Sequence, residues 1–265
     1  MTELNIDISE HIMLVTLNRP DIHNAISHKA MIDEIIDTCE YANQNKTIRA
    51  LILTGAGKSF CAGGNIKDMR DKTDMFAGND ASIEKAYKEG IQRIPLALSN
   101  LEVPIIAAVN GAAVGAGFDI TMMCDIRIAS EDAQFAESFV KLGIIPGDGG
   151  AWFLPRKIGS ARAAQMALTG SMIDAKTALH WGVISECVSP GDLLPRAWEI
   201  AHEIAKNPPL AVRQTKKLLQ QSESLSLAGM LDMCAKTQAQ LHESSDHIEA
   251  VNALLEKRQG HYTGS

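Results

Sequence analysis

The alternation of short apolar runs with longer segments of helical spacing is the feature that most constrains the fold of this chain. The β-rich runs cover residues 12–18, 50–55, 104–111, 125–130 and 182–188. Between the first two runs, residues 27–43 place one apolar stripe on a helical face: Met31, Ile32, Ile35, Ile36 and Cys39. Strands that alternate with helices in this way predict the α/β class.

Two stretches, residues 49–70 and 104–124, share a plan of strand, glycine-rich turn and helix, which indicates repeated units. After residues 207–212 the chain contains no convincing strand and is predicted to be helical. We therefore divide it near residue 205 into a core, 1–205, and a C-terminal helical region, 206–265.

In the C-terminal region, Asp246 and Glu249 have the spacing of a capping box. The residues that form an apolar stripe beside them are Ile248, Val251, Leu254 and Leu255. A helical tail of this kind packs either against a neighbouring subunit or back on its own body, and the sequence favours neither.

The composition and net charge of the chain indicate which kinds of binding partner to expect. The chain has 46% hydrophobic and 22% charged residues, which is typical of a soluble globular protein, and a net charge of -7. Such a charge provides no basic surface for nucleic acid or for an anionic membrane, so a small molecule is the expected partner.

The five cysteines are odd in number and form no CxxC pair, which is typical of reduced thiols in a cytosolic protein. Residues 1–11 lack the pattern of a signal peptide, and no apolar run is long enough to span a bilayer. We therefore expect a cytoplasmic protein.

Three familiar motifs fail on spacing. "TGAGKSF" lacks the first glycine of a P-loop, because Ile52 stands at that position. "GAGFDI" has Ile120 where a dinucleotide fingerprint needs its third glycine. The histidines have no metal-ligand spacing, and His242 and His247 are expected to diverge on one helix, so no metal site is expected.

Two glycine-rich turns remain. "SFCAGGNIKDM" (59–69) reaches Gly63 and Gly64, and "VNGAAVGAGFDI" (109–120) reaches residues 115–117, with Asp119 just beyond. Each turn leaves backbone N–H groups unpaired at the start of a helix. If the two turns converge on one oxygen, they form an oxyanion hole for a thioester or ester carbonyl. Either turn alone is explained as well by close packing, but the two together favour the hole.

At this point five segments, in order along nearly the whole chain, resemble the enoyl-CoA hydratase/isomerase, or crotonase, superfamily: "LNRPDIHNAIS", "GKSFCAGGNIKDM", "VPIIAAVNGAAVGAGFDITMMCDIRIAS", "FAESFVKLGIIPGDGGAWFLPRKIG" and "ALLEKRQGHYTG". The resemblance implies a spiral of β-β-α units and a C-terminal helical trimerisation region. It further implies a homotrimer, or a hexamer of two trimers, that binds acyl-CoA thioesters, with coenzyme A as part of the substrate and no separate cofactor.

The resemblance also assigns residues. Gly64 and Ala116 match the two backbone N–H donors of the oxyanion hole. Ala116 stands where a glycine is usual, and as a backbone donor it still serves if its φ and ψ are unstrained. The residues that match the CoA path are Ala25, Ala62, Asn65, Ile66, Lys67 and Tyr262, the last reaching the site of a neighbouring subunit.

Asp119 matches the first catalytic glutamate of the hydratases and resembles the aspartate of dienoyl-CoA isomerases. The second catalytic glutamate is expected four residues before the glycine of "KLGI", where this chain has Phe139. Phe139 is therefore expected to line the substrate cavity, and the carboxylate must come from elsewhere.

Glu137 and Asp148 are the available substitutes. If residues 135–140 are a strand, Glu137 points to the same face as Phe139. Asp148 follows Gly147, the position at which some isomerases and dehalogenases of the superfamily carry an aspartate. The alternatives are a surface ion pair for Glu137 and a solvated turn for Asp148. An apolar flank that includes Phe139 and Trp152 is expected to raise the pKa of a nearby carboxyl group.

Hydration of an enoyl thioester needs a base for water and an acid for the α carbon, whereas moving a double bond requires only one carboxylate. Because Phe139 replaces one of the two carboxylates, the sequence favours isomerisation of the double bond more than it otherwise would. We expect an enoyl-CoA hydratase or isomerase, with Asp119 as the main proton-transfer group. The alternatives are a β-diketone or thioester hydrolase of the same fold and a non-catalytic or RNA-binding homologue.

Overall fold

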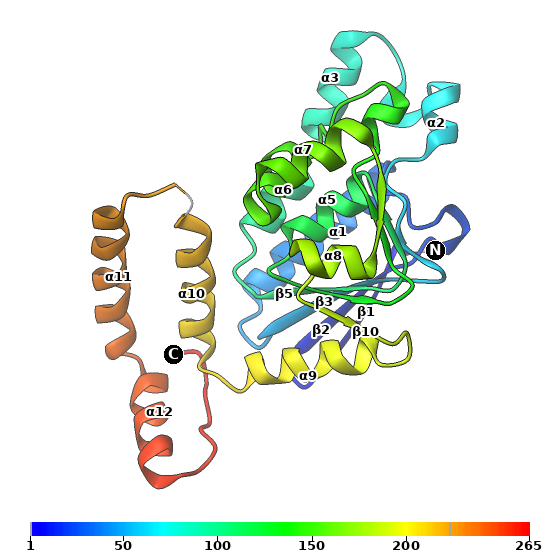
Figure 1. Cartoon of the computed structure of the whole chain (residues 1–265). Coiled ribbons are helices and arrows are strands. Elements are labelled where there is room, and N and C mark those ends of the chain that lie inside the picture. The colour runs from blue at the N-terminus through cyan, green and yellow to red at the C-terminus, as the bar shows by residue number, and fades with distance from the viewer. Residues whose placement is uncertain (1, 223) are drawn as a thin grey trace.

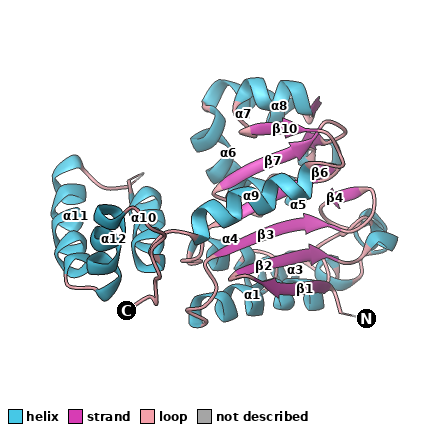
Figure 2. Cartoon of the chain, turned by 90° about the horizontal axis from the view of Figure 1, so that it is seen from below, coloured by secondary structure: helices cyan, strands magenta, loops and turns pink. Residues whose placement is uncertain are grey.

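A computed structural model describes residues 2–222 and 224–265 and contains two sheets (Figures 1 and 2). The larger sheet has the order β1-β2-β3-β5-β7-β10 and is parallel except where β1 pairs with β2. Its strands are β1 (Leu4–Ser9), β2 (Ile12–Leu17), β3 (Ala50–Gly55), β5 (Ile105–Val109), β7 (Ile126–Ser130) and β10 (Glu186–Val188).

Four of the five predicted runs are strands over most of their length, and the fifth is wrong at its start. Helix α8 (Ala175–Trp181) ends at Gly182, which has φ +80°, and the chain then crosses the core before β10 begins. Val183 and Ile184 are buried in this crossing, so their apolar character reflects packing rather than strand pairing.

The smaller sheet, in the order β4-β6-β8-β9, supplies a second short strand to each repeated unit. These strands are β4 (Ser59–Cys61), β6 (Ala112–Val114), β8 (Gln134–Ala136) and β9 (Met172–Asp174). The first unit is β3-β4-α2 (Ile66–Asp71) and the second is β5-β6-α5 (Ala116–Met123). The predicted repeat and the β-β-α spiral are confirmed, and the three-residue strands were too short to be detected by their periodicity.

Alternating side chains of the larger sheet supply two cores. One face, with Ile12, Ile52 and Ile106, packs against α9 (Leu193–Ala205), which crosses the sheet in Figure 2. The other face packs against α1 (Lys29–Gln44) and α5. The predicted apolar stripe of α1 is buried along its whole length.

The remaining elements of the body are short 3-10 helices and α-helices. They are the 3-10 helices η1 (Pro20–Ile22), η2 (Asp74–Phe76) and η3 (Phe139–Leu142), and the α-helices α3 (Asp80–Glu89), α4 (Arg93–Ser99), α6 (Gly150–Ile158) and α7 (Ser160–Thr169).

Three C-terminal helices stand beside the body in both views, α10 (Pro209–Gln221), α11 (Leu227–His242) and α12 (Ser245–Glu256) (Figures 1 and 2). Two buried cations dock α10 onto the core. Arg213 donates to the carbonyls of Ala42 and Asn43 at the end of α1, and Lys216 Nζ donates to Val103 O at 2.9 Å. The helical character of the region is confirmed, whereas its role in assembly stays a prediction.

Two local predictions in this region are wrong because the chain breaks its helix at residues 243–244. Ser244, not Asp246, caps α12, since its side chain accepts from the amide of His247. Asp246 instead accepts from the amides of Thr263 and Gly264 and ties down the C-terminal segment. His242 and His247 lie on different helices and meet, with 3.0 Å between Nδ1 and Nε2.

All five cysteines are unpaired, and burial raises the pKa of Cys39, Cys61 and Cys124 to about 12. Among the described residues no helix combines the length and the apolar character needed to cross a membrane.

Asn24 holds the N-terminal loop against β4. Its backbone has φ +57°, which asparagine tolerates better than most residues. Its fully buried Nδ2 donates to the carbonyls of Ala56, Ser59 and Phe60 at 2.9–3.1 Å, and its Oδ1 accepts from Arg19 N. The second asparagine of the "NRPDIHNA" segment is thus explained by structure.

We expect Asn24→Ala to lower the free energy of unfolding by about 2–4 kcal/mol, because three carbonyls, two of them in buried contacts, lose their donor and alanine is strained at positive φ. Urea unfolding measures this change. The matched control is Asn252→Ala, at an exposed position on α12, which should leave stability nearly unchanged. Equal effects of the two substitutions would contradict the assignment.

Candidate active site

The two glycine-rich turns meet because β4 and β6 are parallel neighbours, so the chain leaves both strands at the same edge of the sheet. A Cβ added to Gly63, which has φ +85°, would lie 2.6 Å from Val114 O and 3.2 Å from Ala116 N. Only glycine fits there, and the contact fixes Gly64 beside the start of α5.

Two amides at this junction remain available as donors. Ala116 is the first residue of α5 and has no carbonyl one turn earlier in the helix. The amides that flank Gly64 are occupied, since Gly63 donates to Cys61 Sγ and Asn65 donates to Ser27 Oγ. Within the described chain neither Gly64 N nor Ala116 N donates a hydrogen bond. This arrangement suits an oxyanion.

Three carboxyl groups gather behind these donors. Asp119 is fully buried on α5, and its Oδ2 accepts from Gly150 N at 3.0 Å. A Cβ added to Gly150 would lie 2.2 Å from both Asp119 Oδ1 and Glu137 Oε1, so the two groups share the space above this glycine. Asp148, 5% exposed, lies close enough to both for its charge to raise their pKa values.

Glu137 turns inward by a different route from the one predicted. Strand β8 ends at Ala136 and the 3-10 helix begins at Phe139, so residues 135–140 are not one strand. Glu137 is nevertheless only 1% exposed. Phe139 is buried against the second turn, 3.6 Å from the position of a Cβ on Gly115. The alternative of a surface ion pair for Glu137 is not found among the described residues, because Glu137 is buried.

Burial raises the pKa of each carboxyl group. It raises that of Asp148 to about 6 and that of Glu137 to about 7, where the charge of Asp148 adds to the effect. The pKa of Asp119 is raised well above its usual value by burial first and then by the charges of Glu137 and Asp148. Trp152 is wrongly predicted to contribute, because it is half-exposed and its ring lies under Arg156.

A cavity of about 770 Å³ extends from the first turn to the Asp148 turn. At one end Met69 lies 2.6 Å from the position of a Cβ on Gly64, and at the other Tyr87 lies 3.4 Å from that of a Cβ on Gly147. The other lining side chains are mixed: the apolar ones are Phe76, Ile83, Leu142, Ile144 and Ile145, and the polar or charged ones are Lys72, Asp80, Glu84, Lys88 and Gln92. The role of Tyr87 in the cavity wall was not predicted from the sequence. Helix α3, which carries Tyr87, has no fully buried residue and so has the character of a surface helix.

The predicted CoA residues fall into two groups. Five of them border the Gly64 turn, because the N-terminal loop pairs with it through Ala62 N to His23 O and Ile26 N to Gly63 O, both at 2.9 Å. These five are Ala25, Ala62, Asn65, Ile66 and Lys67. Ala25 is buried, Asn65 caps α2, and Ile66 and Lys67 are exposed.

Tyr262 lies elsewhere in the chain. Its carbonyl accepts from Arg49 Nη2, just before β3, whereas the turns follow the carboxyl ends of the strands. Within one chain Tyr262 is therefore not brought to the Gly64 turn, and its contact with a neighbouring subunit stays a prediction.

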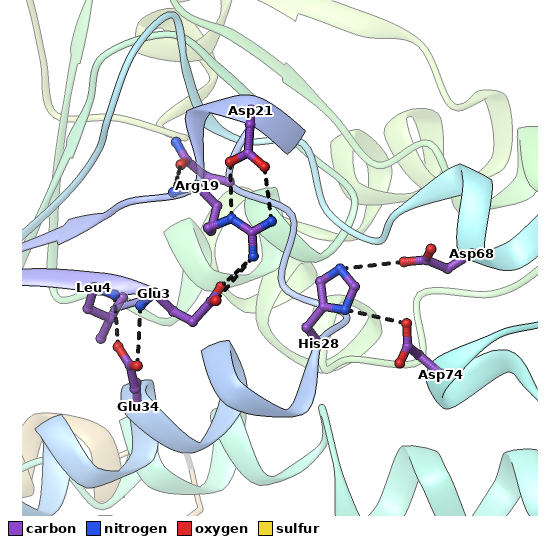
Figure 3. A network of polar contacts seen from close by, with 9 residues as sticks. Glu3, Leu4, Arg19, Asp21, His28, Glu34, Asp68 and Asp74 are labelled. Atoms are coloured by element: carbon purple, nitrogen blue, oxygen red, sulfur yellow. Dashed lines mark hydrogen bonds and ion pairs between the residues drawn. The ribbon is translucent and has the colours of Figure 1, made fainter. Parts of the chain in front are cut away.

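A polar network lies beside the cavity (Figure 3). His28 stands between Asp68 and Asp74, with Nε2 3.6 Å and Nδ1 3.4 Å from their carboxylates. These three side chains are close enough to hold a metal ion, a grouping that spacing alone did not reveal. In the structure the histidine links the start of α1 to α2 and η2, which support the cavity wall.

Parallel β-β-α units thus place two free amides and buried carboxyl groups at one sheet edge. A profile of the enoyl-CoA hydratase/isomerase family matches residues 7–265. The chain is therefore an enzyme of the enoyl-CoA hydratase/isomerase family, as the sequence motifs predicted.

Individual relatives agree with this assignment. The chain is 36% identical over 258 residues to 1,2-epoxyphenylacetyl-CoA isomerase of Escherichia coli, with 97% of each chain covered. It is 32% identical to 2,3-dehydroadipyl-CoA hydratase of the same organism over the full length of both. The crystal structure of enoyl-CoA hydratase from Bacillus anthracis matches with a TM-score of 0.93 and 33% identity, covering 99% of this chain and 100% of that one.

The raised pKa of Asp148 predicts a pH-dependent stability. The pKa of Asp148 is 3.8 in the unfolded chain and about 6 in the folded protein. As the pH rises from about 4 through about 6, the unfolded chain releases this proton more readily than the folded protein does, so the fold loses stability. Asp148→Asn removes this loss. Relative to the parent, the variant should therefore gain about 2–3 kcal/mol in unfolding free energy between pH ~4 and pH ~8.

Denaturant unfolding at a series of pH values measures the gain. Asp232→Asn, on the exposed surface of α11, is the matched control and should show no such trend. A gain that does not change with pH would mean that Asp148 is not held in a raised-pKa environment.

Proposed function

We propose that this protein hydrates a 2-enoyl-CoA thioester through an enolate held by the amides of Gly64 and Ala116. The observation that carries the proposal is the pair of unused amides at touching turns, with three buried carboxyl groups behind them. Negative charge that develops on a thioester oxygen at this position is stabilised by both donors and by the start of α5.

Asp119 is proposed as the main proton-transfer group. It follows Ala116 by three residues on α5 and so lies one helical turn behind the hole. Hydration needs a second carboxyl group. Glu137 and Asp148 both lie near Asp119 and are the candidates for this group. The absence of a carboxylate at Phe139 is thereby offset.

Isomerisation of the double bond is the second candidate, favoured by the apolar ring of Phe139 beside the oxyanion turn. One proton leaves one carbon and returns at another, which a single carboxyl group can perform. The compared relatives are named as hydratases or isomerases, so hydrolysis and RNA binding are not favoured.

The substrate is proposed to enter beside the N-terminal loop, along Ala25, Ala62, Asn65, Ile66 and Lys67, and to place its acyl group in the cavity. Addition of water is redox-neutral, so no cofactor beyond the CoA of the substrate is required. Five unpaired cysteines favour a reducing compartment, for which we propose the cytoplasm.

Asp119→Asn should lower kcat for crotonyl-CoA by about 100- to 10,000-fold, because it removes a positioned acid–base group. Loss of the conjugated chromophore follows the reaction, and a series of longer enoyl-CoA and dienoyl-CoA substrates tests acyl preference. Asp7→Asn, an exposed change on β1, is the matched control. If the parent protein converts none of these thioesters, the proposed activity is wrong.

We further propose that the chain assembles as a homotrimer, or as a hexamer of two trimers, through its C-terminal helices. The apolar stripe of α12 is uncovered, with Ile248 58%, Leu254 79% and Leu255 76% exposed. An apolar surface of this kind is typical of an interface.

Leu254→Glu should shift the protein toward monomer, because a charge in the assembled interface would lose its hydration. Light scattering coupled to size exclusion measures the mass. Lys257→Glu, a charge change just after α12, serves as the control. A parent protein that is monomeric, or a variant that assembles unchanged, would refute the proposed interface.

A further inference from the structure

Asp119 and Glu137 pose an electrostatic problem that the mechanism above leaves open. Asp119 Oδ1 and both carboxylate oxygens of Glu137 are buried, and none of these three atoms accepts a hydrogen bond when both side chains are ionised. Burial of two adjacent unpaired charges is strongly unfavourable. A proton on one of them supplies the missing donor, and a hydrogen bond between the two side chains then forms.

The surroundings offer no other compensation. Gly150 N donates to Asp119 Oδ2 from the start of α6, and Asp148 brings a third acidic group from the preceding turn. Farther out, Cys61 on β4 and Tyr87 on α3 are titratable groups whose pKa values are raised mainly by burial and further by the charge of Asp148. Among the described residues no cation contributes to the pKa of any of the three carboxyl groups. Protons are therefore the available counter-charge.

Access differs among the three groups. Asp148 directly follows Gly147, which lines the cavity, and its charge reaches Tyr87, another lining residue. Glu137 and Asp119 lie together at Gly150, and neither of them is among the lining residues. Its place next to a lining residue suits Asp148 for contact with water or substrate. Asp119 lies on α5 one helical turn from Ala116, so Glu137 is suited to act through Asp119.

We propose that Asp119 and Glu137 share a single proton and that Glu137 is a positioning residue that keeps this proton on Asp119. Asp119 then acts as the acid and Asp148 as the base. The shared proton follows from the geometry alone, whereas the division of roles rests on the proposed function.

For hydration, the steps balance as follows. Asp148 takes a proton from water while the water oxygen bonds to the β carbon, and the π electrons move to the thioester oxygen at Gly64 and Ala116. The enolate then takes the proton of Asp119 at its α carbon. Asp119 and Glu137 are now both ionised, a state that their proximity disfavours, and the proton on Asp148 passes to Asp119. All three groups return to their starting state.

The first experiment compares the pH dependence of kcat/KM for crotonyl-CoA in the parent and in Glu137→Gln. Removing the negative charge beside Asp119 makes that acid release its proton at lower pH, so the alkaline limb should move down by about one pH unit or more, with KM little changed. Glu131→Gln, exposed just after β7, is the matched control and should overlay the parent. A Glu137→Gln variant that folds but keeps the limb in place would overturn the positioning role.

The second experiment needs no catalysis and separates failure of this inference from failure of the proposed function. The pH dependence of unfolding is measured for Asp119→Asn, Glu137→Gln and the double variant. If one proton is shared, each single change abolishes the higher-pH titration step of the pair, because the remaining carboxyl group no longer has an ionisable neighbour. The double variant abolishes both steps, and the two single effects do not sum to the effect of the double variant. Asp119→Asn keeps a donor toward Glu137 and should remain folded even if the second variant does not. Two additive, separate titrations would refute the shared proton.

Discussion

The parallel pairing of β4 with β6 is the contact on which the site depends. These strands have three residues each, yet their register brings the Gly63–Gly64 turn against the start of α5. The pairing is itself secured from outside, because Asn24 holds the carbonyls of Ser59 and Phe60 and the N-terminal loop pairs with the turn. A backbone oxyanion hole requires such bracing, since its donors have no side chain through which to be positioned.

The same junction concentrates acidic groups without a cation. Three buried carboxyl groups cost stability at neutral pH, and a core of two packed layers offsets that cost. Gly150 makes room for the two carboxyl groups of Asp119 and Glu137, because a Cβ at this position would collide with both of them. A strained electrostatic arrangement beside two unused donors is what acid–base chemistry on a thioester needs.

The C-terminal helices stand apart from the body that holds the candidate site. The body completes its own sheets and cores through α9, whereas α10 to α12 extend beside it and are joined to it largely through Arg213 and Lys216 on α10. The apolar stripe of α12 finds no cover within the described chain. This uncovered stripe is the observation on which the proposed trimer rests.

The sequence by itself determined the α/β class, the repeated units, the family and the two glycine turns, because periodicity and local motifs are written in neighbouring residues. It also brought Asp119, Glu137 and Asp148 forward as candidates, although the role that it assigned to Trp152 is wrong. Only the tertiary structure decided that these acids meet over Gly150, that Tyr87 and Met69 wall one cavity and that Tyr262 lies away from the turns. Such contacts join segments tens of residues apart, so their geometry is set by packing and is absent from any local pattern.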